Sequence, residues 1–139
     1  MHGAEVINAL LKIFSNAQHR IDVCGNSKFL AKIFSFSVVG KVRLEVCKRK
    51  DLRQRYIFEI TNENINNCKS LMNTAEVRHL EGHEANFVTN QNECLGFITL
   101  QKESLQATYS NIKEVVEQQG SVFETFWIKQ FQQKIRLKR

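Results

Sequence analysis

Two histidines, three glutamates and an arginine lie together in residues 76–87, the segment EVRHLEGHEANF. His79 and His83 are four residues apart, the spacing that places two imidazoles on one face of a helix for metal binding. Gly82 lies between them, and the His-Glu-x-x-His order of zinc hydrolases is absent. We therefore expect neither a metal site nor another cofactor here.

Nucleophilic or acid-base chemistry is the second interpretation of this segment. Cys94 has no fixed spacing to His79, and Ser110 is better placed as a helix cap, so we expect neither to act as a nucleophile. Glu81 and Glu84 have the chemistry of general acids or bases. No spacing singles them out, so this interpretation stays open.

The third interpretation is a ligand site at the edge of a sheet. Ligands of mainly parallel sheets bind beyond the carboxyl ends of the strands. Two of the strand ends expected here lead into helix N-termini, whose free amides suit an anion. The predicted ligand-binding residues are Asn26, Ser27, Glu59, Thr61, Arg78, His79 and Asn86. The alternative is a local role for each, with Asn26 and Thr61 as turn and cap residues and His79 in the core. Arg78 would then form a surface ion pair.

Hydrophobic periodicity places these residues in an α/β fold. Apolar residues recur every three or four positions in residues 4–18, which predicts an amphipathic N-terminal helix. Strands are predicted at 21–23, 55–60 and 75–80, with helices starting at Ser27 and Thr61. Residues 36–54 fit a strand as well as a helix, and we favour a helix from about Val42. Residues 85–100 predict two strands joined by a polar turn. The expected fold is a small, mainly parallel sheet with a β-hairpin extension, flanked by the N-terminal helix and a long C-terminal helix.

The C-terminal helix is predicted at about residues 110–135, followed by a basic tail. Such a helix would be roughly 40 Å long, more than the width of a domain of this size, so its last turns should project or meet another chain. Two arrangements stay open: packing across its own sheet, or formation of a homodimer. The residues predicted for a dimer interface are Val115, Val116, Phe123, Phe126 and Trp127.

Composition predicts one domain spanning residues 1–139, with a formal net charge of +6. Residues 41–55 contain seven Lys or Arg against Glu45 and Asp51. This basic segment is either a solvated surface or a site for nucleic acid, acidic lipid or an acidic protein. The candidate polyanion-binding residues are Lys48, Arg49, Lys50, Arg53 and Arg55. No aromatic residue is interleaved with them before Tyr56, so the stacking platform of a single-strand binder is missing.

Localisation signals are absent from the sequence as given. No apolar run approaches the roughly 18 residues of a membrane span, and the start lacks a basic region and a cleavage site. The four cysteines lie more than twenty residues apart, which predicts free thiols. We expect a cytoplasmic protein.

Four segments carry a family resemblance: IDVCGNS, RYIFEITNENINNCKSLM, EVRHLEGHEANF and YSNIKEVVEQQGSVFETFW. Together they resemble the input domain that precedes the kinase module of many archaeal sensor histidine kinases. The resemblance covers residues 21–26 and most of 55–127, whereas residues 28–54 do not match. The same outline is similar to the phospholipase-D-like fold used as an effector domain by archaeal sugar-responsive transcription regulators.

The resemblance implies a non-catalytic protein. Phospholipase-D chemistry uses a His-x-Lys sequence followed by an aspartate, and the corresponding place here, residues 83–87, has no lysine. Without that charge the transition state loses stabilisation. No kinase motif is present in the chain either.

The function implied is a ligand-sensing or regulatory interaction domain in signal transduction, and not an enzyme. Its expected partners are a second copy of the chain, a small-molecule or anionic ligand, and a signalling protein. The alternative is a degenerate phospholipase-D-like nuclease or a nucleic-acid-binding protein that uses residues 41–55.

Overall fold

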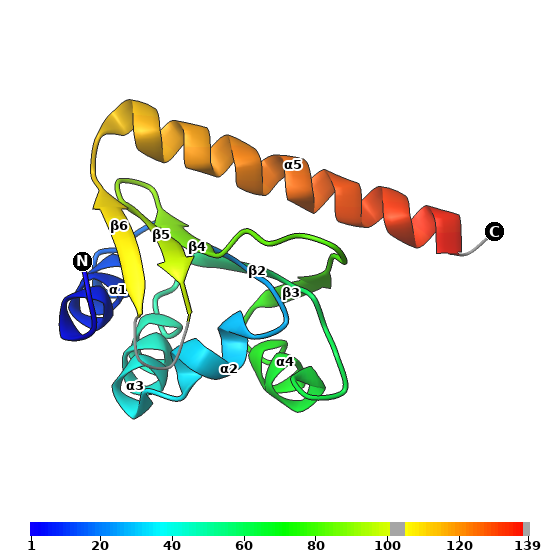
Figure 1. Cartoon of the computed structure of the whole chain (residues 1–139), viewed down its shortest axis with the longest axis horizontal. Coiled ribbons are helices and arrows are strands. Elements are labelled where there is room, and N and C mark those ends of the chain that lie inside the picture. Colours follow the sequence, from blue (N-terminus) through cyan, green and yellow to red (C-terminus); the bar gives the residue numbers. More distant parts are fainter. Residues whose placement is uncertain (101–104, 138–139) are drawn as a thin grey trace.

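A six-stranded sheet lies between two layers of helices (Figure 1). The computed structural model describes residues 1–100 and 105–137, with side chains as far as Lys129. The elements in chain order are α1 (Ala4–Ser15), β1 (Arg20–Gly25), α2 (Phe29–Phe34), α3 (Ser37–Val46), β2 (Arg53–Phe58), α4 (Ile65–Leu71), β3 (Glu76–His79), β4 (Phe87–Asn90), β5 (Cys94–Thr99), β6 (Gln106–Ser110) and α5 (Lys113–Leu137).

The sheet is mixed, with strand order β3-β2-β1-β4-β5-β6. Strands β1, β2 and β3 are parallel, because α2 and α3 connect the first pair and α4 connects the second. Strands β4, β5 and β6 extend the sheet in antiparallel fashion. The predicted α/β class, hairpin extension and two flanking helices are confirmed. The sequence did not predict β6, which makes the antiparallel part larger than expected.

Helix α3 resolves the ambiguous middle of the chain. Val39, Arg43 and Val46 are buried at helical spacing, so the strand-like alternation of this segment is incidental. The helix begins at Ser37, earlier than the predicted start near Val42.

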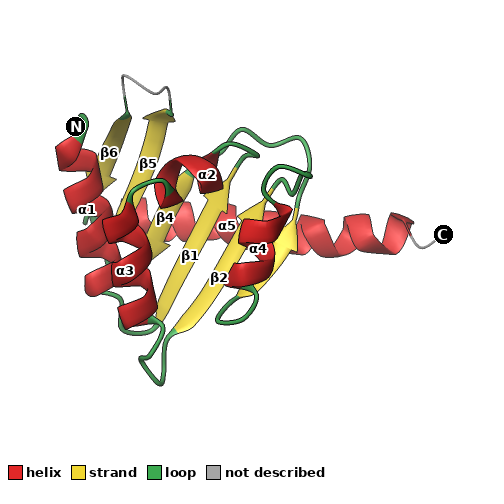
Figure 2. Cartoon of the chain, turned by 90° about the horizontal axis from the view of Figure 1, so that it is seen from below, coloured by secondary structure: helices red, strands yellow, loops and turns green. Residues whose placement is uncertain are grey.

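Both faces of the sheet are covered, as Figure 2 shows: α1 to α4 pack on one face and α5 crosses the other. Because helices cover both faces, the side chains of a strand that point to opposite faces enter two different cores, as β1 shows. Ile21 and Val23 belong to the core under α1 to α4, while Cys24 belongs to the smaller core under α5.

Helix α5 crosses the sheet and its last turns extend past it (Figure 1). The predicted length and the predicted projection are therefore confirmed. Val116, Phe123 and Trp127 attach the first part to the sheet and are 3%, 0% and 8% exposed. Within the described residues, no helix is long and apolar enough to cross a membrane.

Candidate functional site

The carboxyl ends of β1, β2 and β3 meet at one edge of the sheet, as predicted. Asn64, which the sequence did not single out, joins the segments that follow β1 and β2. Its side-chain amide donates to the carbonyls of Ser27 and Glu59 over 3.1 and 3.0 Å, and its oxygen accepts from the Thr61 amide over 2.8 Å. Asn64, not Thr61, is therefore the residue that organises the start of α4.

Asn26 and Asn86 meet at the same edge. The Asn86 oxygen accepts from the Asn26 amide over 2.8 Å. The Asn26 oxygen in turn accepts from the amides of Lys28 and Phe29 over 3.0 and 3.2 Å, so Asn26 takes the capping role predicted for Ser27. These polar atoms hold the loops in place.

Glu59 and His79 also serve the loops. The Glu59 carboxylate accepts from the Gly82 amide over 3.3 Å, and His79 Nδ1 accepts from the Ile60 amide over 2.9 Å. The other imidazole nitrogen of His79 lies 3.4 Å from the Glu81 carboxylate. The local interpretation thus holds for Asn26 as a turn residue, but His79 is half-buried beside Glu81 and does not lie in the core.

Arg78 is the predicted ligand-binding residue whose side chain goes elsewhere. Its guanidinium lies 3.7 Å from the centre of the Trp127 ring on α5. Neither a surface ion pair nor a strand-end ligand contact describes this stacking.

An open pocket of about 800 Å³ lies beside this edge. Asn26, Asn86, Glu84, Lys28 and Lys32 supply its polar and charged lining. Of the predicted ligand-binding residues, Asn26 and Asn86 line this pocket.

Cys24 and His83 form a buried pair that the sequence did not predict. The Cys24 sulfur lies 3.8 Å from His83 Nδ1, and the imidazole packs against Phe126. Burial raises the pKa of the Cys24 thiol to about 12, and burial lowers the pKa of His83 despite nearby carboxylates. Both groups are therefore neutral at pH 7, which is unsuitable for a cysteine nucleophile. The two residues are far apart in sequence, so no spacing could have revealed the pair.

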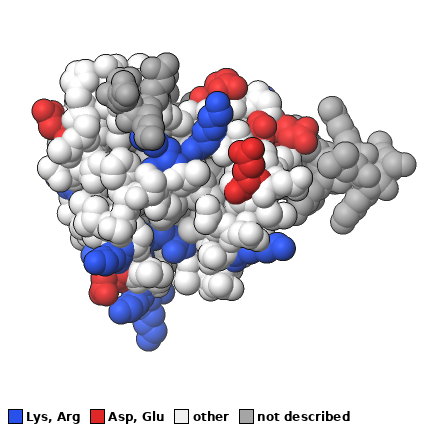
Figure 3. Space-filling model, turned by 60° about the horizontal axis from the view of Figure 1, so that its bottom comes forward, with Lys and Arg blue, Asp and Glu red and all other residues white. Residues whose placement is uncertain are grey.

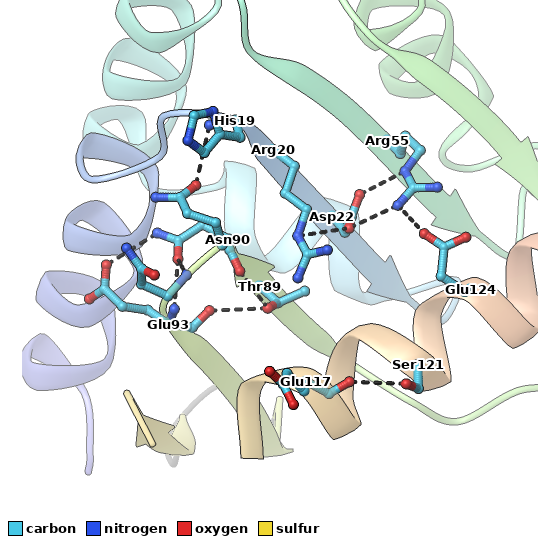
Figure 4. A network of polar contacts seen from close by, with 12 residues as sticks. His19, Arg20, Asp22, Arg55, Thr89, Asn90, Glu93, Glu117, Ser121 and Glu124 are labelled. Atoms are coloured by element: carbon cyan, nitrogen blue, oxygen red, sulfur yellow. Dashed lines mark hydrogen bonds and ion pairs between the residues drawn. The ribbon is translucent and has the colours of Figure 1, made fainter. Parts of the chain in front are cut away.

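A network of charged side chains lies between the sheet and α5 (Figure 4). Arg55 on β2 contacts both oxygens of Asp22 on β1, and it donates to Glu124 on α5 over 2.5 Å. Arg20 approaches Asp22 at 3.8 Å and passes close to Gly120, where an added methyl group would lie 3.3 Å from the guanidinium. A side chain at position 120 would therefore require the Arg20 guanidinium to shift by a few tenths of an ångström.

Arg55 must therefore be removed from the predicted polyanion-binding residues. It is 5% exposed and its charge is paired with two carboxylates. Arg53 pairs with Glu76 and Lys48 pairs with Glu45, both at the surface.

The predicted dimer interface also needs correction. Val116, Phe123 and Trp127 are buried against the sheet of their own chain and are unavailable to a partner. Val115 remains 39% exposed and Phe126 is half-buried. Dimerisation itself stays a prediction.

The amino-terminal edge of β1 borders a second open groove, of about 1070 Å³. Five cationic side chains from α1, β1, the loop between α3 and β2, and α5 line it, and we call this the cationic groove. They are Lys12, Arg20, Arg49, Lys50 and Lys113. Figure 3 shows cationic side chains gathered at the end of the molecule where the loop between α3 and β2 lies.

Three carboxylates also line the groove, and the most deeply placed one forms an ion pair with Lys12 at 3.9 Å. Glu93 is 5% exposed and accepts from Tyr109, Asn90 and Asn16 over 2.5, 3.1 and 3.1 Å. Burial alone would raise its pKa, but these bonds outweigh burial and hold the pKa below its usual range. The other two, Asp51 and Glu117, are exposed. Amide side chains, including Gln91 and Asn111, complete a polar lining.

A metal site is not formed by the described residues, because no three His, Cys, Asp or Glu side chains are grouped to hold an ion. His79 and His83 point to different surroundings, His79 to the loop after β2 and His83 to Cys24 and Phe126.

Comparisons with known proteins relate the chain to others through its fold. The sequence matches no protein-family model and no curated protein. The structure is similar to TrmBL2, an archaeal chromatin protein whose structure shows a novel mode of DNA binding, with a TM-score of 0.69 and 13% identity over 93% of this chain and 51% of that one. The chain thus spans about half the length of TrmBL2.

NucT from Helicobacter pylori is similar as well, with a TM-score of 0.68 and 9% identity over 88% of this chain and 87% of that one. This likeness supports the expected phospholipase-D-like outline as a resemblance of fold. The expected resemblance to sensor kinases gains no support from these comparisons.

Proposed function

We propose that this chain is a non-catalytic nucleic-acid-binding domain that contacts the phosphate backbone through the cationic groove. The observation that carries the proposal is the convergence of five cations from four separate parts of the chain around one open, polar groove. Arg49 and Lys50 form no ion pair with another described residue, whereas Lys12, Arg20 and Lys113 each lie 3.8 to 3.9 Å from a carboxylate. Phosphate contacts from Lys and Arg supply most of the affinity in sequence-independent binding. The sequence pI of about 9.3 adds a long-range attraction for polyanions.

Duplex nucleic acid suits this groove better than a single strand. Tyr109 is the aromatic residue in its lining, and Lys12 lies over its ring at 5.0 Å while Glu93 accepts its hydroxyl proton. Lys12 thus occupies one face of this ring, which makes Tyr109 a poor stacking platform for a base. Likeness of fold to a DNA-binding chromatin protein supports the same class of ligand.

The strand-end site supports the non-catalytic part of the proposal. His83 turns inward to Cys24, and Glu84 and Asn86 line the neighbouring pocket without a histidine beside them. The lining of this pocket places Glu84 beside Lys28 and Lys32 and includes no histidine that could transfer a proton to or from a phosphoryl transition state.

A binding titration with matched variants tests the proposal. The fluorescence anisotropy of a labelled duplex DNA is measured at several salt concentrations between about 50 and 200 mM. Replacing Lys50 and Lys113 by Gln should weaken binding and reduce the slope of log affinity against log salt by up to about 1.8. The control replaces Lys28 and Lys32 by Gln, which removes the same charge from the strand-end pocket.

Two results would contradict the proposal. One is binding that does not depend on salt. The other is an equal loss of affinity in both double variants, because that would show a response to net charge alone.

A second candidate is the ligand-sensing regulatory domain predicted from the sequence, acting as a homodimer. The accessible strand-end pocket of about 800 Å³ favours it. A ligand there would bias signalling only by binding one arrangement of the protein more tightly than another. A thermal-shift screen of small molecules against the unaltered protein and the Asn86→Leu variant tests this candidate. A ligand of the pocket should raise the unfolding temperature of the unaltered protein only.

A further inference from the structure

Arg43 in α3 is a buried cation without a carboxylate partner. Its side chain is 6% exposed, its Nε donates to the Tyr56 hydroxyl over 3.1 Å, and its Nη2 donates to Thr74. No Asp or Glu among the described residues forms an ion pair with it. Buried charges in proteins are ordinarily paired, because an unpaired charge loses its hydration without compensation.

Arg55 provides the internal comparison. It is as deeply buried as Arg43, yet it contacts two carboxylates, Asp22 and Glu124. The Arg43 guanidinium has five N–H donors, and the contacts above use two of them. Donors remain for a two-point contact with a carboxylate.

The surroundings of Arg43 provide room for such a group. It lines an open pocket of about 360 Å³ between α2, α3 and α4. Leu30, Phe34, Leu44 and Leu71 form apolar walls, and Asn67, Ser70, Asn73 and Thr74 supply polar groups. This volume lies within the range of about 300 to 1,000 Å³ that is typical of small-molecule sites.

We propose that this pocket binds a small molecule with an apolar body and one carboxylate, which pairs with Arg43. The apolar walls select the body of the ligand, and the unpaired guanidinium selects its charge. The pocket lies in the helix layer opposite α5 and shares no lining residue with the cationic groove, so the proposal does not rest on nucleic-acid binding.

Gly40 offers a variant that closes the pocket without damaging the fold. It lines the pocket within α3, and a Cβ atom added there would meet no atom within 4 Å. Leucine at this position should therefore place its side chain in the pocket, and it favours a helix more than glycine does. Arg43→Gln is the direct test of the charge, but its loss of the Tyr56 and Thr74 contacts also affects stability.

Calorimetric titration with octanoate, octanol and octylamine tests the proposal, because these probes share one apolar tail and differ in charge. Octanoate should bind with one-to-one stoichiometry and at least about tenfold more tightly than octylamine. Gly40→Leu should abolish octanoate binding while its thermal unfolding temperature stays equal or rises. Equal affinity for the three probes, absence of octanoate binding, or unchanged binding by Gly40→Leu would each overturn the proposal.

Discussion

Asp22 and Arg55 lie directly opposite each other on the parallel strands β1 and β2 and form a two-point ion pair with distances of 2.9 and 3.1 Å. Asp22 is 1% exposed, and α5 closes over the pair with Phe123 and Glu124. Hydrogen bonding and attraction from Asp22 and Glu124 outweigh the effect of burial and raise the pKa of Arg55. Burial, in contrast, raises the pKa of Asp22, although Arg55 and Arg20 act in the opposite direction. The contacts of Arg55 with Asp22 and Glu124 fix the position of α5 on the sheet.

Replacing Asp22 by Asn should lower the free energy of unfolding by about 3 to 5 kcal/mol, because Arg55 would keep its buried charge without its main partner. Glu124→Gln is the matched control, since it also removes one carboxylate from Arg55 but lies half exposed. Its cost should stay below about 1 kcal/mol. Urea denaturation followed by circular dichroism measures both, and equal losses would show that burial of the pair is unimportant.

Acidification should weaken the fold through His83. Burial lowers its folded-state pKa below the ordinary value of 6.5, so the unfolded chain takes up a proton first as the pH falls. The stability due to neutral His83 is thus fully present above pH 6.5 and decreases as the pH is lowered through the folded-state pKa. Glu93 and Glu124 also have lowered pKa values, but their ordinary value of 4.5 places their losses at lower pH.

The measurement is the unfolding free energy between about pH 7.5 and 5 for the unaltered protein and for His83→Leu. The variant should show a flatter profile in this window. His19→Gln, at an exposed histidine, should keep the original slope. A slope that persists in His83→Leu would assign the pH dependence to another group.

Sequence periodicity predicted the main helices and strands because their apolar residues face a core. It failed at β6, whose five residues include only two that are apolar or aromatic, Ala107 and Tyr109, and whose partner is the hairpin strand β5. Such a strand is defined by its neighbour and not by its own pattern.

The candidate sites show the same limit. The convergence of polar residues at the strand ends could be predicted, since parallel strands share an edge. The sequence could not predict that Arg55 is paired with carboxylates and that Arg43 is not. Both arginines lie in one basic segment, and they differ only in which strand or helix faces them. Local charge patterns do not contain that information.

Cys24 should be unreactive in the folded protein. Its pKa of about 12, compared with 9.0 for an unperturbed thiol, lowers the thiolate fraction about a thousandfold. Brief treatment with iodoacetamide at pH 8, followed by mass spectrometry, should modify the partly exposed Cys47 well before Cys24. Denatured protein is the control, in which both should react alike. Rapid native modification of Cys24 would show that α5 does not cover it stably.

The exposed face of α5 now provides the proper test of dimerisation. Val115 and Val122 are 39% and 37% exposed, so replacing each by Glu should leave the unfolding free energy nearly unchanged. If the helix forms a homodimer through this face, the buried charges should convert the dimer to a monomer in analytical ultracentrifugation.

Phe123→Ala serves as the contrasting variant for this experiment. Phe123 is fully buried beneath the helix and stacks on Trp127 with ring centres 5.7 Å apart, so its truncation should cost about 3 to 5 kcal/mol of stability. Loss of the dimer in Phe123→Ala alone would reflect detachment of α5 from the sheet. An unchanged mass of the Val115→Glu and Val122→Glu variants, both still folded, would exclude this face as the dimer interface.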